Sequence, residues 1–153
     1  MEIRKATRKD FTQIMNLVKT LPEWFDDHAV NFEIPNDLKF HDCFVAEENQ
    51  KIIGFISFST VDGDAFVSWI GIDPASFRQG IGTALITKTC EQLHQLDFRK
   101  LKVKTLSKNI KYKPYAATHN FYKKMGFKKV GTEFITDNKT GEKLEMDVLE
   151  KSI

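Results

Sequence analysis

The sequence has very little cysteine and no long apolar run. Its two cysteines, Cys43 and Cys90, form neither a Cys-x-x-Cys pair nor a disulfide framework, and we interpret both as reduced core residues. No stretch approaches the roughly 18 apolar residues that a membrane-spanning helix needs, and the N-terminus is polar and charged. We therefore predict a cytoplasmic protein with no membrane partner.

The sequence also lacks an excess of either charge. Twenty-three basic and 21 acidic residues leave a formal net charge of +2, which argues against a general nucleic-acid binder. The four histidines lack the spacing of metal ligands, so we predict no metal site.

What is present fits one domain, residues 1–153, with a core rich in phenylalanine. Hydrophobic periodicity predicts helices over 8–21, 82–96 and 116–125, and leaves room for a short helix before Pro35. Alternating patterns predict strands over 2–6, 43–48, 51–60, 65–72, 100–106, 127–136 and 143–150. This order predicts a mixed sheet with helices packed against it.

Two glycines stand where a strand gives way to a helix, in "FRQGIGTALI" (77–86). The first N–H groups of a helix have no internal partner and carry about half a positive charge. Glycines such as Gly80 and Gly82 let phosphate oxygens approach those groups, and Arg78 adds charge. A tight turn without a ligand explains the glycines equally well. The dinucleotide fingerprint and the P-loop both fail, because Leu85 replaces a third glycine and Thr83-Ala84 follows Gly82.

A third pattern fits better. "IGIDPASFRQGIGTALI" followed by "HNFYKKMGF" resembles the GNAT superfamily of acyl-CoA-dependent N-acyltransferases. Gly80 and Gly82 match the glycines of its pyrophosphate motif, Gln/Arg-x-x-Gly-x-Gly/Ala, although Phe77 occupies the first position. Phe121, Tyr122, Gly126 and Phe127 match the "FY…GF" of its late helix. Tyr115 and Thr118 stand where the family often has Asn and Ala.

The resemblance implies an α/β (α+β) fold with a mostly antiparallel sheet of about seven strands and flanking helices. It also implies that a central parallel pair, 65–72 and 100–106, splays apart to hold the pantetheine arm of acetyl-CoA. Backbone groups of Ile70, Gly71 and Ile72 would bind pantetheine and the thioester carbonyl, and rigid donors at a developing oxyanion are a large catalytic contribution. The other implied cofactor contacts are Arg78, Gln79, Gly80, Ile81, Gly82, Thr83, Asn120 and Phe121.

Tyr122 is the general acid that the resemblance implies. A thiol with a pKa of about 8.5 and a tyrosine with a pKa of about 10 are roughly matched for proton transfer. Helical spacing predicts a core stripe of Ala117, Phe121 and Met125, which places Tyr122 at its edge and within reach of a cleft. A half-buried packing role for Tyr122 is the alternative.

The general base stays open. Many relatives carry a glutamate on the strand before the pyrophosphate motif, but "AFVSWIGI" (65–72) has no carboxylate and only Ser68. The remaining candidates are Glu47, Asp73 and Glu23, acting directly or through water.

The acceptor is predicted from the variable segment "PEWFDDH" (22–28). Acidic and aromatic side chains together suit a cationic amine, so we predict that Glu23, Trp24 and Phe25 contact the substrate. A solvated helix face with two core aromatics is an equal alternative. The sequence does not choose between a small amine, an antibiotic, a polyamine and a protein amine.

The leading function is an N-acetyltransferase that moves an acetyl group from acetyl-CoA to a primary amine by direct attack in a ternary complex. A non-catalytic acyl-CoA-binding or sensor module is the alternative, because the strand carboxylate is missing. A third class, a nucleic-acid-binding domain, would use the lysines between Lys100 and Lys113, but the low net charge argues against it. A homodimer is left open.

Overall fold

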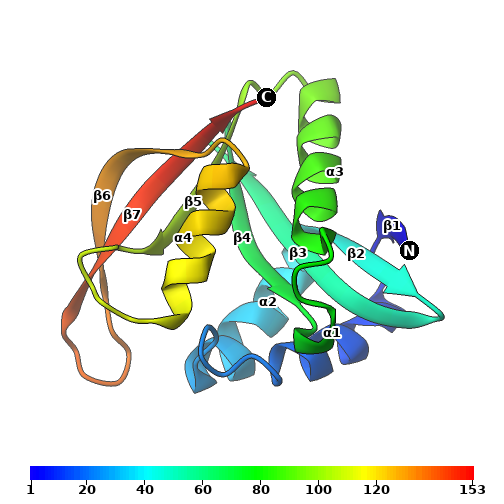
Figure 1. Cartoon of the computed structure of the whole chain (residues 1–153), viewed down its shortest axis with the longest axis horizontal. Coiled ribbons are helices and arrows are strands. Elements are labelled where there is room, and N and C mark those ends of the chain that lie inside the picture. The colour runs from blue at the N-terminus through cyan, green and yellow to red at the C-terminus, as the bar shows by residue number, and fades with distance from the viewer.

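The computed structural model describes all 153 residues and forms one seven-stranded sheet with helices on both faces (Figure 1). The strands are β1 (Glu2–Lys5), β2 (Asp42–Glu48), β3 (Lys51–Val61), β4 (Asp64–Ile72), β5 (Lys100–Leu106), β6 (Lys128–Thr136) and β7 (Lys143–Ser152). Their spatial order is β1-β2-β3-β4-β5-β7-β6, and only the β4–β5 pair is parallel. The predicted mixed, mostly antiparallel sheet is confirmed.

The α-helices are α1 (Phe11–Val18), α2 (Ile34–Phe40), α3 (Ile81–Gln95) and α4 (Pro114–Lys124). Short 3₁₀ turns at Arg8–Asp10 and Pro74–Ser76 precede α1 and follow β4. A π-helical turn, Ala29–Glu33, leads directly into α2. None of these helices has the length and apolar character needed to span a membrane.

Two apolar clusters hold the helices against the sheet. One joins α3 and α4 to one face through residues such as Leu85, Tyr122 and Val67. The other joins α1 and α2 to the opposite face through residues such as Leu17 and Phe55. Cys43 and Cys90 pack at the edges of these clusters and are both free, as predicted.

The predicted helix boundaries needed correction at two places. The helix expected over 8–21 starts as a 3₁₀ turn and ends at Val18, so it stops before Pro22 is reached. The short helix expected before Pro35 is the π-helical turn Ala29–Glu33, and it continues through this proline into α2. Proline at this point has no N–H to donate to a carbonyl of the preceding turn.

The central parallel pair is very short. β4 and β5 pair only at Ala65–Leu101, Phe66–Lys102 and Val67–Val103. At this point the β3–β4 register shifts, with Phe58 opposite Val67 and Ser57 opposite Trp69, so Ser68 is the extra residue of a β-bulge. From Ser68 onward β4 has lost its β5 partner. The predicted splay of the two strands is confirmed, and it opens a gap in the sheet after Val67.

Candidate active site

The edge of β4 that borders the gap carries free backbone groups. The N–H of Asp73 donates to the carbonyl of Ile53 on β3 at 2.8 Å. Residues of an antiparallel pair alternate between bonding the neighbouring strand and pointing away from it. Gly71 therefore bonds toward β3, whereas the backbone groups of Ile70 and Ile72 point into the gap. Of the three predicted backbone contacts, the gap offers Ile70 and Ile72.

The absence of a side chain at Gly71 is explained by packing rather than by a backbone group that faces the gap. A Cβ at this position would lie 2.8 Å from Cε1 of Phe55 and 3.2 Å from Cδ1 of Leu21. The glycine thus lets the chain after α1 approach the sheet closely, on the face opposite α3.

The loop between the 3₁₀ turn and α3 has an unusual backbone. Arg78 and Gly80 both lie in the left-handed region, with φ of 62° and 77°. Such a φ costs a non-glycine residue such as Arg78 about 1 kcal/mol or more, and strain of this kind clusters at functional sites. Gly80 is the N-cap of α3, and a Cβ added to it would meet nothing within 4 Å. Open space therefore surrounds the backbone at the N-terminus of α3.

The first turn of α3 favours an anion. It contains no acidic residue, and the N–H groups of Ile81, Gly82 and Thr83 precede the first intrahelical donor, Ala84, which bonds Gly80 at 3.0 Å. Gln79, Arg78 and Thr83 are exposed, whereas the side chain of Ile81 is buried. These residues lie together around the N-terminus of α3, where Ile81 can contribute only its backbone.

Gly82 does not face the same open space as Gly80. A Cβ there would lie 3.0 Å from Cε1 of Phe121 on α4. The missing side chain therefore lets α3 and α4 approach each other beside the helix N-terminus, and Phe121 is next to the predicted phosphate site.

Trp24 joins three parts of the site. Its indole N–H donates to Oγ1 of Thr118 on α4 at 3.2 Å, and its ring lies edge-on to Phe77, 6.1 Å between centroids. Phe25 is 7% exposed and packs against Trp69, 5.9 Å between centroids, so it belongs to the core. Glu23 is exposed. Of the three predicted substrate contacts, Trp24 lies closest to the loop before α3.

Tyr122 is deeply buried on α4. It is 3% exposed, and its ring lies 5.3 Å from that of Phe121 and 5.2 Å from that of Phe127. It belongs to the same apolar cluster as Val67 and Val103, the last residues of the parallel pair. Burial raises the pKa of Tyr122 well above its ordinary value, so the phenol keeps its proton.

The predicted stripe on α4 was only partly right, because Phe121 and Met125 do pack against the core cluster. Ala117 is exposed, and the fully buried residues of this helix are His119 and Tyr122. His119 is held by a 2.7 Å hydrogen bond between Nε2 and the carbonyl of Leu106 at the end of β5. Tyr122 is therefore at the centre of the buried face rather than at its edge.

Two of the three carboxylates predicted as bases, Glu47 and Asp73, are already paired, whereas Glu23 is exposed. Glu47 accepts from Nε of Arg4 at 2.8 Å, on β2, two strands away from β4. Asp73 follows β4 directly but pairs with Nζ of Lys51 at 3.0 Å and accepts from the N–H of Ala75. The hydrogen bond from Lys51 holds the pKa of Asp73 below its ordinary value, which weakens it as a proton acceptor.

Acidic partners neutralise the first half of the lysine run. Lys100, Lys102 and Lys104 form ion pairs with Glu150, Asp64 and Glu133. The later lysines, 108, 111 and 113, line a pocket of about 450 Å³ beside the start of α4. Asn120 lines this pocket too.

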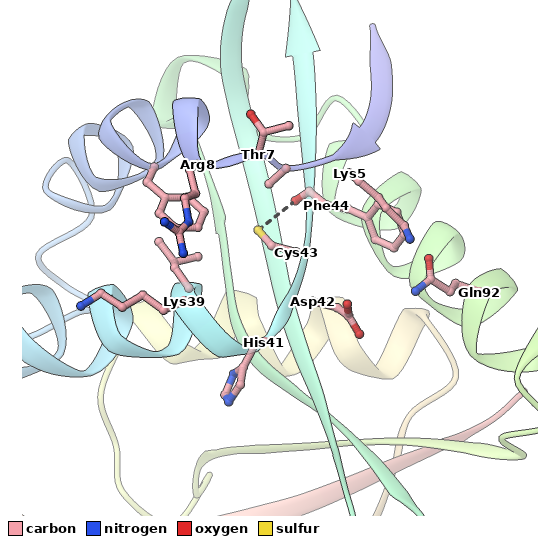
Figure 2. Close-up of a pocket in the computed structure, with 12 residues that line it drawn as sticks. Lys5, Thr7, Arg8, Lys39, His41, Asp42, Cys43, Phe44 and Gln92 are labelled. Atoms are coloured by element: carbon pink, nitrogen blue, oxygen red, sulfur yellow. Dashed lines mark hydrogen bonds between the residues drawn. The ribbon is translucent and has the colours of Figure 1, made fainter.

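A second pocket, of about 210 Å³, lies at the other end of the sheet (Figure 2). It is bordered by the end of β1, the start of α1 and the end of α2, with Lys5, Arg8 and Lys39 around it. Figure 2 shows the imidazole of His41 pointing away from Thr7 and Lys5. No cluster of three or more His, Cys, Asp or Glu side chains suited to a metal occurs in the chain.

Sequence reasoning missed a polar network at the bulge of β4. Ser68 Oγ lies 2.9 Å from Nδ1 of His41, and Nε2 of His41 lies 3.8 Å from Oδ1 of Asp37. The indole N–H of Trp69 donates to the other oxygen of Asp37 at 2.8 Å. The only sequence signal was Ser68 in an otherwise apolar strand.

Comparison with known proteins agrees with this geometry. The family described as "Acetyltransferase (GNAT) domain" matches residues 39–129. No curated protein matches the chain, but many solved structures share its fold. One is a GNAT-family acetyltransferase structure from Desulfovibrio desulfuricans, with TM-score 0.80 and 17% identity, covering 99% of this chain and 98% of that one.

Two further neighbours have named substrates. The ribosomal-protein-S18-alanine N-acetyltransferase of Escherichia coli has TM-score 0.75 and 18% identity, over 99% of this chain and 93% of that one. An aminoglycoside 6'-N-acetyltransferase complexed with coenzyme A has TM-score 0.74 and 17% identity, over 99% and 97%. Identities this low establish the fold alone, whereas the family match spans more than half of the sequence. The chain belongs to the GNAT acetyltransferase family.

Proposed function

We propose that this acetyltransferase moves the acetyl group of acetyl-CoA to a primary amine by direct attack in a ternary complex. The observation that carries the proposal is the gap between β4 and β5, which runs from Ser68 toward the open N-terminus of α3. The pyrophosphate would lie at Gly80–Thr83 beside Arg78, where free N–H groups and a guanidinium favour an anion. The pantetheine amides would pair with the free backbone groups of Ile70 and Ile72.

Tyr122 is the proposed general acid. The amine nitrogen bonds to the thioester carbonyl carbon, the carbon–sulfur bond breaks, and the departing thiolate takes the phenolic proton. Burial raises the pKa of Tyr122, and the same apolar surroundings disfavour a thiolate, so the pKa of both partners rises. The pKa values of the phenol and of the departing thiol therefore stay roughly matched for proton transfer.

The amine would approach from the side of Trp24 and of the chain between α1 and α2. The named substrates of the structural neighbours, an aminoglycoside and a ribosomal protein's alanine, are both primary amines. In this chain, the aromatic Trp24 and the exposed Glu23 suit a cationic amine of either kind. We leave the choice between small-molecule and protein amines open.

Acetyl-CoA binding and thiol release test the proposal. Ligand at about 100 times Kd stabilises the folded state by about 2.7 kcal/mol, which raises Tm by roughly 5–10 °C for a chain of this size. We expect Gly82→Val to weaken acetyl-CoA binding at least tenfold, or about 1.4 kcal/mol, because the new side chain pushes Phe121 into the site. Gly131→Val on β6, where a Cβ meets nothing within 4 Å, is the matched control.

Two results separate this enzyme from a binding module. Thiol release from acetyl-CoA in the presence of an aminoglycoside, spermidine or an alanyl peptide supports transfer. Binding heat without thiol release for any amine supports the non-catalytic module, which the paired carboxylates Glu47 and Asp73 favour. No binding heat at millimolar acetyl-CoA contradicts both.

A further inference from the structure

Ser68 occupies the point where the sheet opens. It follows Val67, the last residue of β4 that pairs with β5, and it is the extra residue of the bulge. It precedes Ile70, whose backbone groups point into the gap, by two residues, or about 6.6 Å along a strand. Ser68 therefore lies two residues along β4 from the backbone groups proposed to hold the thioester.

The bulge also fixes which way Ser68 faces. Consecutive side chains of a regular strand point to opposite faces, but here Ser68 and Trp69 both bond to groups at the end of α2. Both side chains therefore lie on the α1–α2 face, opposite the face that holds Tyr122.

The partners of Ser68 form a chain of neighbouring polar side chains. Trp69 donates to Asp37 at 2.8 Å, which holds the carboxylate beside the imidazole. Asp37 Oδ1 lies 3.8 Å from Nε2 of His41, and His41 Nδ1 lies 2.9 Å from Ser68 Oγ. An N–H at Nε2 facing the carboxylate leaves Nδ1 free to accept the serine proton. Both His41 and Asp37 keep about a quarter of their side chains exposed, 24% and 28%, so a proton can pass on to solvent.

We propose that Ser68, His41 and Asp37 form the proton relay that deprotonates the acceptor amine; the inference rests on the acetyltransferase function proposed above. Ser68 is the catalytic residue that touches the amine, and His41 and Asp37 are positioning residues that act through it. This relay supplies the base that the paired carboxylates Glu47 and Asp73 do not.

The protons balance in two steps. The bound ammonium gives one proton to Ser68 Oγ while the serine proton passes to His41 Nδ1, and His41 later releases it to solvent. The neutral amine then bonds to the carbonyl carbon, the carbon–sulfur bond breaks, and the thiolate takes the proton of Tyr122. The second amine proton restores Tyr122. The net products are the amide, coenzyme A thiol and one proton.

Several charged groups surround His41 and bear on its protonation. Asp37 faces it from α2, and Lys39 and Asp42 flank it along the chain. Lys5 and Arg8 lie across the pocket that His41 borders. The carboxylate of Asp37 lies 3.8 Å from Nε2 of His41.

Single and double variants test the relay. We expect Ser68→Ala and His41→Gln each to lower kcat/KM by about 10²-fold, because general base catalysis supplies roughly 10²–10⁴. The double variant should fall no further than the worse single one, because members of one relay act as a unit. The acid limb of the wild-type pH–rate profile should disappear in His41→Gln, whereas Ser68→Thr, which keeps the hydroxyl, should retain most activity.

The reaction is followed by thiol release from acetyl-CoA with spermidine, an aminoglycoside, an alanyl peptide, or water alone as acceptor. His94→Gln on the exposed end of α3 and Ser152→Ala at the exposed end of β7 are matched controls with wild-type rates expected. Acetyl-CoA binding heat and Tm are measured for every variant, and both should stay near wild type. If His41→Gln does not fold, Ser68→Ala decides alone.

The failures are distinguishable. A Ser68→Ala variant that keeps more than half of the wild-type kcat/KM would overturn the relay and leave the acetyltransferase function intact. Additive effects of the two single variants would have the same consequence. Absence of acetyl-CoA binding heat, or of thiol release to every acceptor including water, overturns the proposed function and the relay with it.

Discussion

Replacing Tyr122 with phenylalanine separates a chemical role of its hydroxyl from a packing role of its ring. The ring lies among Phe121 and Phe127, and phenylalanine preserves both aromatic contacts. The free energy of unfolding should therefore change by less than about 1 kcal/mol, the net worth of one hydroxyl. Chemical denaturation measures that change.

The expected loss of rate is much larger. If the hydroxyl protonates the thiolate, kcat falls by about 10²–10⁴, which is roughly 3–5 kcal/mol in the barrier. Binding of acetyl-CoA should stay within about twofold, because the proposed contacts to the cofactor are backbone groups of β4 and α3. Since burial raises the pKa of Tyr122, the donor keeps its proton across the working range and adds no limb to the pH profile there.

The assay is steady-state thiol release with the best amine of the panel, paired with calorimetry of acetyl-CoA. Tyr115→Phe is the matched control, because it removes a hydroxyl from the same helix that only donates to the carbonyl of Trp24 at 3.4 Å. We expect it to keep a kcat close to wild type. A Tyr122→Phe variant that retains more than half of the wild-type kcat would refute the acid role and leave the cofactor site standing.

Three further predictions concern stability and reactivity. Arg4 hydrogen-bonds Asp10 and holds the pKa of its carboxyl at about 2, below the ordinary 3.8. Asp10→Asn should therefore lower the free energy of unfolding by about 2 kcal/mol at pH 7. The wild type should lose the same stability as pH falls from 4 through 2, which urea titrations at each pH will measure. Gly71→Ala should destabilise by about 1–3 kcal/mol, because its Cβ would lie 2.8 Å from Phe55; an unchanged urea midpoint would contradict this. Burial raises the pKa of the Cys43 thiol to about 12, so iodoacetamide at pH 8 should alkylate it only after unfolding, as mass spectrometry can measure.

The strands were predictable because their patterns are strictly local. Leu101, Val103 and Thr105 alternate with lysines, and the strand expected over 100–106 has those bounds in the structure. Asn49 and Gln50 both have positive φ, 51° and 62°, as a two-residue hairpin requires.

The helices show where local patterns fail. Pro35 was expected to follow a short helix, but the π-helical turn Ala29–Glu33 leads directly into α2 and the helical run continues through this proline. On α4, Ala117 and Phe121 suggested the buried face, but α3 approaches from the side of Phe121 and the sheet takes Tyr122. Which side of a weakly amphipathic helix is buried depends on its neighbours, and those are set by the tertiary fold.

The candidate site also has one part that the local sequence predicts and one part that only the fold brings together. Gly80 and the helix start after it form one continuous motif, and the structure keeps them together. Ser68, His41 and Asp37 come from two distant segments and meet only because a one-residue bulge turns Ser68 toward α2. No spacing in the sequence encodes such a meeting.

The gap gives the proposed chemistry a physical advantage. Tyr122 belongs to the cluster under α3 and α4, whereas Ser68 and His41 lie on the face under α1 and α2. An acid and a base placed side by side would exchange their proton directly or shift each other's pKa. With the sheet between them, they communicate only through a thioester bound in the opening between β4 and β5. Each side chain can then hold its own protonation state until both reactants are bound, which is the advantage of dividing the proposed donor and acceptor between the two faces.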